Sequence, residues 1–184
     1  MAFEVACRKR EGVTLIPPPE EILAAAPEAT RRLRLPFRWQ VEVTEKGKLH
    51  RLGVEPDRVF GLCFKGRPAG RDCVYFFLEA DRGTMPVVRQ GLDQTSFRRK
   101  LLGYQETWRQ GLHRRHLGIP NFRVLTVTTT EDRLAHLLEA CRSNPGSAGI
   151  FLFGHQRGIA RGHLLNYEWV DRRGVRTSLF AANR

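Results

Sequence analysis

Three carboxylates stand at the ends of two short apolar segments of this chain. They are Asp57, just before the segment 58–64, and Glu79 and Asp81, at the end of the segment 73–80. Because successive residues of a strand point to opposite faces, Glu79 and Asp81 should share one face. If the two segments pair, Asp57 joins them at one edge of a sheet. Such a set of oxygen ligands suits Mg²⁺ or Mn²⁺, with several waters kept on the ion.

A simpler interpretation of the same carboxylates is pairing with arginines. An acidic group at the end of an apolar strand is costly unless a neighbour neutralises it. Arg58 and Arg82 are adjacent to these acids in the sequence and could do so. The spacing of the residues alone leaves both interpretations open.

The elements that must position these carboxylates follow from apolar periodicity and from turn residues. Their order predicts one mixed α/β domain over residues 1–184, with a central mixed sheet flanked by helices. Strands are expected at 13–16, 37–43, 58–64, 73–80, 122–128 and 149–153, helices at 19–26, 96–111 and about 130–144, and a small hairpin within 167–180.

The helix expected at 96–111 carries a second chemical group. Its apolar stripe consists of Phe97, Leu101, Tyr104 and Trp108. Lys100 lies about 60° from the centre of this stripe, at its edge. A lysine in this position can bury its stem and extend its ammonium group toward the acidic cluster.

Basic residues occupy the exposed side of the same helix and the segment after it. The candidate nucleic-acid-binding residues are Arg82, Arg98, Arg99, Arg109, Arg114 and Arg115. Contacts from such residues to phosphates are independent of base sequence. The alternative is a solvated helix face paired with Glu106 and other surface acids. The segment 113–116 could be read as a histidine ligand pair, but a basic loop is the favoured interpretation.

The charge of the chain favours a polyanionic partner. The 184 residues are 41% hydrophobic and 27% charged, with a net charge of +12. Residues 95–184 contain 15 Lys and Arg but only 6 Asp and Glu. A basic half beside a small acidic cluster is typical of a protein that holds nucleic acid and carries out metal chemistry on it. A merely soluble basic protein is the alternative.

The four cysteines exclude a familiar zinc motif and favour buried, reduced thiols. Cys63 and Cys73 could face one another across neighbouring strands, although no disulfide is required. No signal peptide opens the chain and no apolar run approaches the length of a membrane span. We therefore expect a cytoplasmic protein without a membrane partner.

The stretch from about 53 to 142 resembles the replication-relaxation family of plasmid and mobile-element proteins. The matching segments are 55–57 (Glu-Pro-Asp), 76–84, 97–104 and 122–127, with a looser match over 151–179. The order of Pro-Asp, a distal glutamate and a lysine also resembles the PD-(D/E)xK nuclease superfamily. These resemblances imply a restriction-endonuclease-like core.

The resemblance implies a metal-dependent phosphodiesterase. Asp57 and Glu79 would bind Mg²⁺ or Mn²⁺, with the backbone carbonyl of Ala80 as a further ligand. The superfamily lysine stands two residues after the glutamate, where this chain has Asp81. Lys100 is the candidate for a migrated lysine that stabilises charge on the scissile phosphate. The candidate catalytic residues are therefore Asp57, Glu79, Asp81 and Lys100.

The leading hypothesis is a DNA endonuclease or nickase that acts in plasmid or mobile-element DNA processing. The departure at Asp81 keeps a second one open, a non-catalytic DNA-binding accessory of a relaxosome or replication-control complex. A protein–protein adaptor with a basic surface would instead show no DNA affinity. Relatives of this type commonly carry a winged-helix segment ahead of the nuclease-like domain, so we expect this chain to be either an excised C-terminal domain or a reduced form. The sequence is compatible with a monomer or a homodimer.

Overall fold

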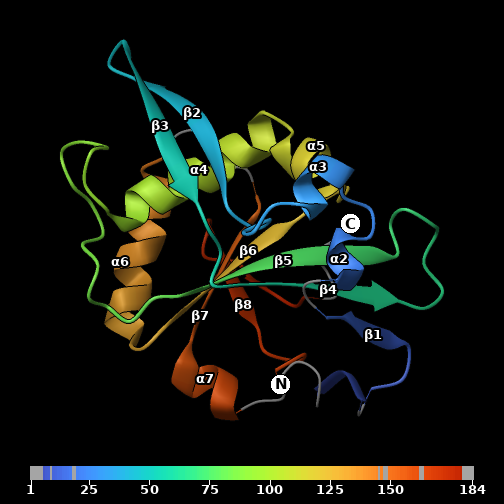
Figure 1. Cartoon of the computed structure of the whole chain (residues 1–184). Coiled ribbons are helices and arrows are strands. Elements are labelled where there is room, and N and C mark those ends of the chain that lie inside the picture. Colours follow the sequence, from blue (N-terminus) through green and yellow to red (C-terminus); the bar gives the residue numbers. More distant parts are fainter. Residues whose placement is uncertain are drawn as a thin grey trace.

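A computed structural model describes residues 6–8, 10–17, 20–144, 146, 149–161 and 164–179 (Figure 1). Within these residues one mixed sheet has the strand order β1 (Val13–Ile16), β4 (Arg58–Phe64), β5 (Cys73–Ala80), β6 (Arg123–Thr128), β7 (Phe151–His155), β8 (Trp169–Asp171) and β9 (Arg176–Thr177). Strands β5, β6 and β7 run parallel, and every other neighbouring pair in this sheet is antiparallel. The predicted mixed sheet flanked by helices is confirmed.

The two faces of this sheet support separate hydrophobic clusters. Phe77 belongs to the cluster on the first face, which also contains residues of the neighbouring strands β6 and β7. Phe76, the adjacent residue, belongs to the cluster on the opposite face. Both phenylalanines are fully buried. This alternation explains why β5 is apolar almost throughout, since a strand in the middle of a covered sheet must be buried on both sides.

Two long helices cover the first face. They are α4 (Phe97–Arg109), which begins after the N-cap Ser96, and α6 (Glu131–Arg142), which begins after the N-cap Thr130. Each N-cap side chain accepts a hydrogen bond from the backbone N–H three residues later, which explains why both helices begin where the sequence predicts. Shorter helices are α2 (Glu20–Leu23), α3 (Glu28–Arg31) and α7 (Gln156–Arg161). Over the described part of the chain, no helix combines the length and apolar character needed to cross a membrane.

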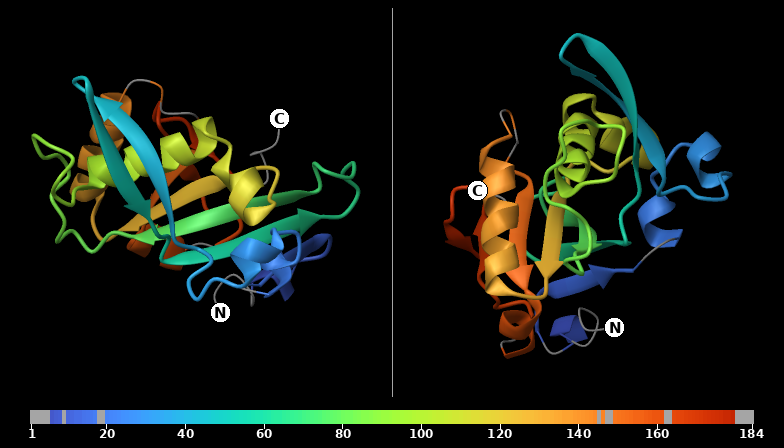
Figure 2. Two further views of the ribbon diagram at one scale, coloured as in Figure 1. Left: turned by 45° about the horizontal axis from the view of Figure 1, so that its top comes forward. Right: turned by 90° about the vertical axis from the view of Figure 1, so that its left-hand side faces the viewer.

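A two-stranded hairpin packs beside α4, apart from the main sheet. It consists of β2 (Trp39–Glu45) and β3 (Lys48–Val54), paired antiparallel (Figure 2). The turn residues Lys46 and Gly47 both have positive φ, as a two-residue hairpin turn requires. Strand β3 is not among the strands that the sequence predicts, because its polar residues interrupt the apolar pattern to which the buried Leu52 and Val54 belong.

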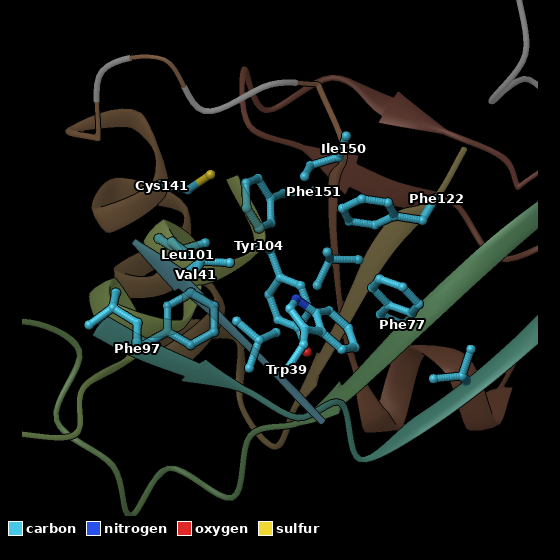
Figure 3. Packing of buried hydrophobic residues seen from close by; sticks show 14 of the residues in the cluster. Trp39, Val41, Phe77, Phe97, Leu101, Tyr104, Phe122, Cys141, Ile150 and Phe151 are labelled. Atoms are coloured by element: carbon cyan, nitrogen blue, oxygen red, sulfur yellow. The ribbon is translucent and has the colours of Figure 1, made fainter. Parts of the chain in front are cut away.

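The core of the first face joins the hairpin, α4 and the sheet. Figure 3 shows Trp39 of the hairpin and Tyr104 of α4 lying beside Phe77 of the sheet. The ring centroid of Phe77 is 5.5 Å from that of Trp39 and 5.9 Å from that of Tyr104. The Trp39 indole also donates a hydrogen bond of 2.8 Å to the hydroxyl of Thr107 on α4. These contacts fix α4 over the end of β5, where the site residues lie.

The segment that follows α4 forms a helix, so the prediction of a basic loop at 113–116 is wrong. Helix α5 (Leu112–Leu117) lies between two glycines with left-handed backbone conformations. His113 is buried and stacks on Trp108 with 4.9 Å between ring centroids. A Cβ at Gly118 would lie 2.0 Å from the backbone oxygen of Ala25, so this helix end requires glycine.

Two of the four cysteines form a disulfide, so the expectation of four reduced thiols is wrong. Cys63 of β4 lies directly opposite Cys73 of β5, and their Cα atoms are 4.0 Å apart. The antiparallel register brings the two side chains together on the same face. The other two cysteines, Cys7 and Cys141, are buried, and burial raises the pKa of the Cys7 thiol.

Candidate metal and nucleic-acid site

Backbone hydrogen bonds hold Asp57 against the end of β5. The Asp57 N–H donates to the carbonyl of Leu78 at 3.0 Å, which extends the antiparallel ladder of β4 and β5. In return, Oδ2 of Asp57 accepts the N–H of Ala80 at 2.7 Å. The Asp57 side chain is exposed, and its Oδ1 accepts no hydrogen bond from the described residues. One carboxylate oxygen is therefore fixed and the other remains available to a ligand.

Glu79 lies two residues further along β5 from Phe77 and is almost completely buried, with 3% of its surface exposed. Its Oε2 accepts a hydrogen bond from Nζ of Lys100, and its Oε1 accepts one from the hydroxyl of Tyr104. Burial raises the pKa of Glu79, and the charge of Asp57 adds to that rise. Lys100 and Tyr104 oppose the rise but do not cancel it. The Asp57 carboxylate therefore lies close enough for its charge to act on Glu79.

Helix α4 supplies the two donors to Glu79 from successive turns of one face. Lys100 and Tyr104 are four residues apart, so they lie one above the other on the helix. The stem of Lys100 extends along the edge of the apolar stripe, and 36% of its side chain is exposed. The structure thus brings Lys100 to Glu79, as its position at the edge of the predicted stripe suggested.

Asp81 faces a different partner. Its carboxylate receives two hydrogen bonds from the guanidinium of Arg133, at 2.8 and 2.9 Å, and one from the hydroxyl of Thr128 at 2.9 Å. Arg133 also donates to the carbonyl of Met85 at 2.6 Å. Both oxygens of Asp81 are therefore engaged by β6 and α6, not directed at Asp57 and Glu79. This strand-end carboxylate is paired with an arginine, although neither Arg58 nor Arg82 is that arginine.

Two pockets meet at Glu79 and Lys100. The larger, which we call the Arg99 pocket, has a volume of about 190 Å³ and is lined in addition by Val54, Glu55, Met85, Ser96, Arg99 and Tyr104, among others. The smaller has a volume of about 110 Å³ and continues from Glu79 past Ala80, Asp81 and Arg82. The buried carboxylate and the lysine therefore stand at the junction of two hollows.

The carboxylates at the end of β5 fit a hard divalent cation. Asp57 and Glu79 offer carboxylate oxygens, and Mg²⁺ is commonly held by one or two carboxylates with waters in its remaining positions. Within the described residues, no group of three or more histidine, cysteine or acidic side chains is arranged around one point. A cation here would depend on Asp57, Glu79 and water, and Glu79 would share its oxygens with Lys100 and Tyr104.

Two of the arginines predicted to bind nucleic acid are neutralised by acids. Arg98 of α4 forms an ion pair with Glu45 of the hairpin. Arg109, near the end of α4, donates from Nε to both oxygens of Glu106, at 3.0 and 2.8 Å. For these two residues the geometry agrees with the alternative of a paired helix face.

The other predicted arginines fall into two separate places. Arg82 and Arg99 line the smaller and the larger pocket, beside the carboxylates. Arg114 and Arg115 are exposed on α5, at the far end of α4 (Figure 1). From Lys100 to its last residue, Arg109, helix α4 rises about 14 Å, and α5 begins beyond that end. The predicted continuous basic face is therefore divided into a group at the pockets and a group on α5.

Sequence reasoning missed two residues that contact these acids. The predicted apolar stripe of α4 contains Tyr104. Its hydroxyl group, four residues after Lys100 on the same helix face, was the feature that could have indicated a contact with Glu79. Arg133 follows the N-cap Thr130 in the first turn of α6. In a parallel strand–helix unit that turn lies at the carboxyl ends of the strands, which places Arg133 near Asp81. The order of elements could have suggested this pairing.

The family model described as Replication-relaxation matches residues 20–122, more than half of the chain. The matched span includes Asp57, Glu79 and Lys100. It begins earlier than the resemblance seen in the sequence and ends before β6, so the segments expected to match over 122–127 and 151–179 lie almost entirely outside it. No curated protein and no solved structure is significantly similar to the chain.

Proposed function

The chain belongs to the replication-relaxation family, and from this premise we propose that it cuts or nicks plasmid or other mobile-element DNA with a divalent metal ion. The observation that carries the proposal is the meeting of Asp57, Glu79 and Lys100 at one end of β5. Glu79 and Lys100 are in contact at the junction of two pockets, and Asp57 lies close enough for its charge to act on Glu79, so the three residues can hold a phosphodiester and a metal ion together.

The chemistry divides between the metal ion and the protein. When bound by Asp57 and Glu79, Mg²⁺ or Mn²⁺ would polarise the phosphate and lower the pKa of a water. The ammonium of Lys100 stabilises the negative charge that develops on the scissile phosphate. Tyr104 holds the Glu79 carboxylate in place through Oε1, and the N–H of Ala80 does the same for Asp57.

The same residues fit a PD-(D/E)xK arrangement with a displaced lysine. The Pro56–Asp57 pair precedes β4, Glu79 lies in β5, and the lysine comes from α4 instead of the position two residues after Glu79. The pairing of Asp81 with Arg133 supports this interpretation, because it gives the residue in the usual lysine position a structural partner.

DNA is the proposed substrate because membership of a replication-related family and the positive charge of the chain both favour it. The net charge is +12, and the arginines at the pockets and on α5 carry positive charge without a carboxylate partner at ion-pair distance among the described residues. Arg82, Arg99, Arg114 and Arg115 are therefore the proposed phosphate contacts. Arg98 and Arg109 should contribute less, since nearby acids already offset their charges.

A plasmid-nicking assay tests this proposal. Supercoiled plasmid is incubated with wild type, Glu79→Gln or Glu106→Gln, with EDTA, Mg²⁺ or Mn²⁺. Glu106 is a matched control because it is also buried and paired with a cation, but it lines neither of the two pockets that meet at Glu79. We expect wild type and Glu106→Gln to produce open-circular or linear plasmid only with metal. Glu79→Gln should lower the rate by about 10²-fold or more.

A non-catalytic DNA-binding accessory is the second candidate. Asp81 in the position of the usual lysine favours it, and so does the engagement of both Glu79 oxygens by Lys100 and Tyr104. Salt-dependent DNA binding with no cleavage under any metal condition would select this candidate. Metal-dependent cleavage that Glu79→Gln leaves unchanged would place the chemistry elsewhere. Absence of DNA binding would favour an adaptor.

A further inference from the structure

The Arg99 pocket contains a cation that the proposed cleavage chemistry does not use. Arg99 lies on α4 directly before Lys100, and its guanidinium makes no hydrogen bond or ion pair with any described residue. Its Nε is buried, and none of the residues that the structure describes offers it an acceptor. By contrast, Arg98 and Arg109 of the same helix are paired with Glu45 and Glu106.

A buried guanidinium donor without an acceptor is costly, and in native structures it calls for a specific explanation. Arginine presents several donors in a planar fork that matches the oxygens of a phosphate. The start of α4, at Ser96, adds the positive end of the helix dipole to the same pocket. An anion from outside the chain would satisfy Arg99.

The volume of the Arg99 pocket restricts its ligand to a small anion. Its volume of about 190 Å³ is below the range of about 300–1,000 Å³ typical of pockets that enclose drug-sized ligands. Val54 and Met85 offer an apolar wall against which a sugar can pack. Glu55 also lines the pocket, but its carboxylate lies 3.7 Å from Nε of Arg38, which offsets its charge.

We propose that the Arg99 pocket binds the phosphate next to the scissile phosphate on the same nucleic-acid strand. The proposal rests on the proposed function, because it takes Lys100 and Glu79 as the place of the scissile phosphate. Since the pocket shares both residues with that place, one strand can occupy the two positions at once. Arg99 would then set which phosphodiester reaches Lys100.

Binding of two mononucleotides tests this assignment without any cleavage. Thymidine 3′,5′-bisphosphate and thymidine 5′-monophosphate are titrated by calorimetry, with Ca²⁺ in place of Mg²⁺. Wild type should bind the bisphosphate about ten- to hundredfold more tightly, as expected for one charge-assisted contact. Arg99→Gln should remove this preference and leave the affinity for the monophosphate unchanged. Arg109→Gln, the control on the same helix, should keep it.

One further variant and one further readout keep the outcome interpretable. Arg99→Lys retains the charge but not the planar fork, so it should show an intermediate preference. Thermal unfolding of each variant establishes that it is folded. A wild-type protein without the preference, or a folded Arg99→Gln that keeps it, would overturn the assignment.

The result separates this inference from the proposed nuclease function. Plasmid that is never cut, together with an Arg99-dependent preference for the bisphosphate, would remove the nuclease proposal and leave a phosphate-binding pocket. Metal-dependent cleavage, together with a preference for the bisphosphate that is unchanged in Arg99→Gln, would support the nuclease proposal and contradict the pocket assignment.

Discussion

Replacing Arg133 with methionine should destabilise the fold, because Asp81 would lose the cation that neutralises it. The Asp81 side chain is 6% exposed and that of Arg133 is 15% exposed, so the pair lies largely out of water. Methionine retains much of the length of the arginine stem while removing both hydrogen bonds to Asp81 and the one to the carbonyl of Met85.

The size of the effect follows from the burial of the pair. Removing one partner of a buried ion pair typically costs about 3–5 kcal/mol. Asp81 would keep the hydroxyl of Thr128 as a donor, so we expect about 2–4 kcal/mol for Arg133→Met. For a protein of 184 residues, a loss of about 3 kcal/mol lowers the melting temperature by about 6–12 °C.

The loss should depend on pH. Burial acts to raise the pKa of Asp81, but hydrogen bonds from Arg133 and Thr128, together with the Arg133 charge, outweigh burial and lower the pKa. A carboxylate with a lowered folded pKa stabilises the fold above its unfolded pKa of about 3.9. In Arg133→Met burial acts without the cation, so the pKa rises. The difference in the free energy of unfolding between wild type and variant should have its full size at pH 7. It should shrink as the pH falls through the raised pKa of the variant and then the lowered pKa of wild type.

Urea denaturation at a series of pH values measures this difference. The control is Arg142→Met, which removes an exposed arginine from the same helix together with one hydrogen bond to the carbonyl of Arg172, and it should lower stability by less than about 1.5 kcal/mol. An Arg133→Met variant as stable as the control at pH 7 would refute the reasoning, and so would a deficit that grows as the pH falls.

Three further predictions concern the site and its basic residues. Lys100→Met should reduce metal-dependent cleavage by about 10²-fold or more while DNA affinity in a gel-shift assay changes little; equal loss of both would argue against transition-state stabilisation. Tyr104→Phe removes a hydrogen bond that opposes the burial-raised pKa of Glu79, so the acidic limb of the cleavage pH profile should move to higher pH, whereas an unmoved limb would contradict this role. Arg98→Gln and Arg109→Gln should barely change the salt dependence of DNA binding, and a slope reduced by about one for either would show that it contacts a phosphate.

The sequence predicted the elements whose local signals are strong. Strands β4 and β5 have the predicted bounds, because each is a compact apolar run between turn residues. Helices α4 and α6 begin where Ser96 and Thr130 predict, because N-caps act over three residues. The approach of Lys100 to Glu79 was also predictable. It depends only on the position of Lys100 around the axis of α4 and on the face of β5 to which Glu79 points.

The misses depend on tertiary contacts that a single sequence does not show. Strand β3 is stabilised by packing of its buried residues against α4, while its own composition is polar. Because the hairpin was only half predicted, the pairing of Glu45 with Arg98 could not be foreseen. Helix α5 depends on the burial of His113 against Trp108, which outweighs its basic, loop-like composition.

Direct measurement of Mn²⁺ binding tests whether Asp57 and Glu79 form one metal site. The electron paramagnetic resonance signal of free Mn²⁺ is followed during titration with protein at pH 7. Asp81→Asn is the matched control, because Asp81 belongs to the same strand end but is engaged by Arg133. We predict that wild type and Asp81→Asn remove free Mn²⁺ alike, whereas Asp57→Asn and Glu79→Gln bind at least about tenfold more weakly. Undiminished free Mn²⁺ with wild type, or weakening by Asp81→Asn but not by Asp57→Asn, would contradict a metal site built on these two carboxylates.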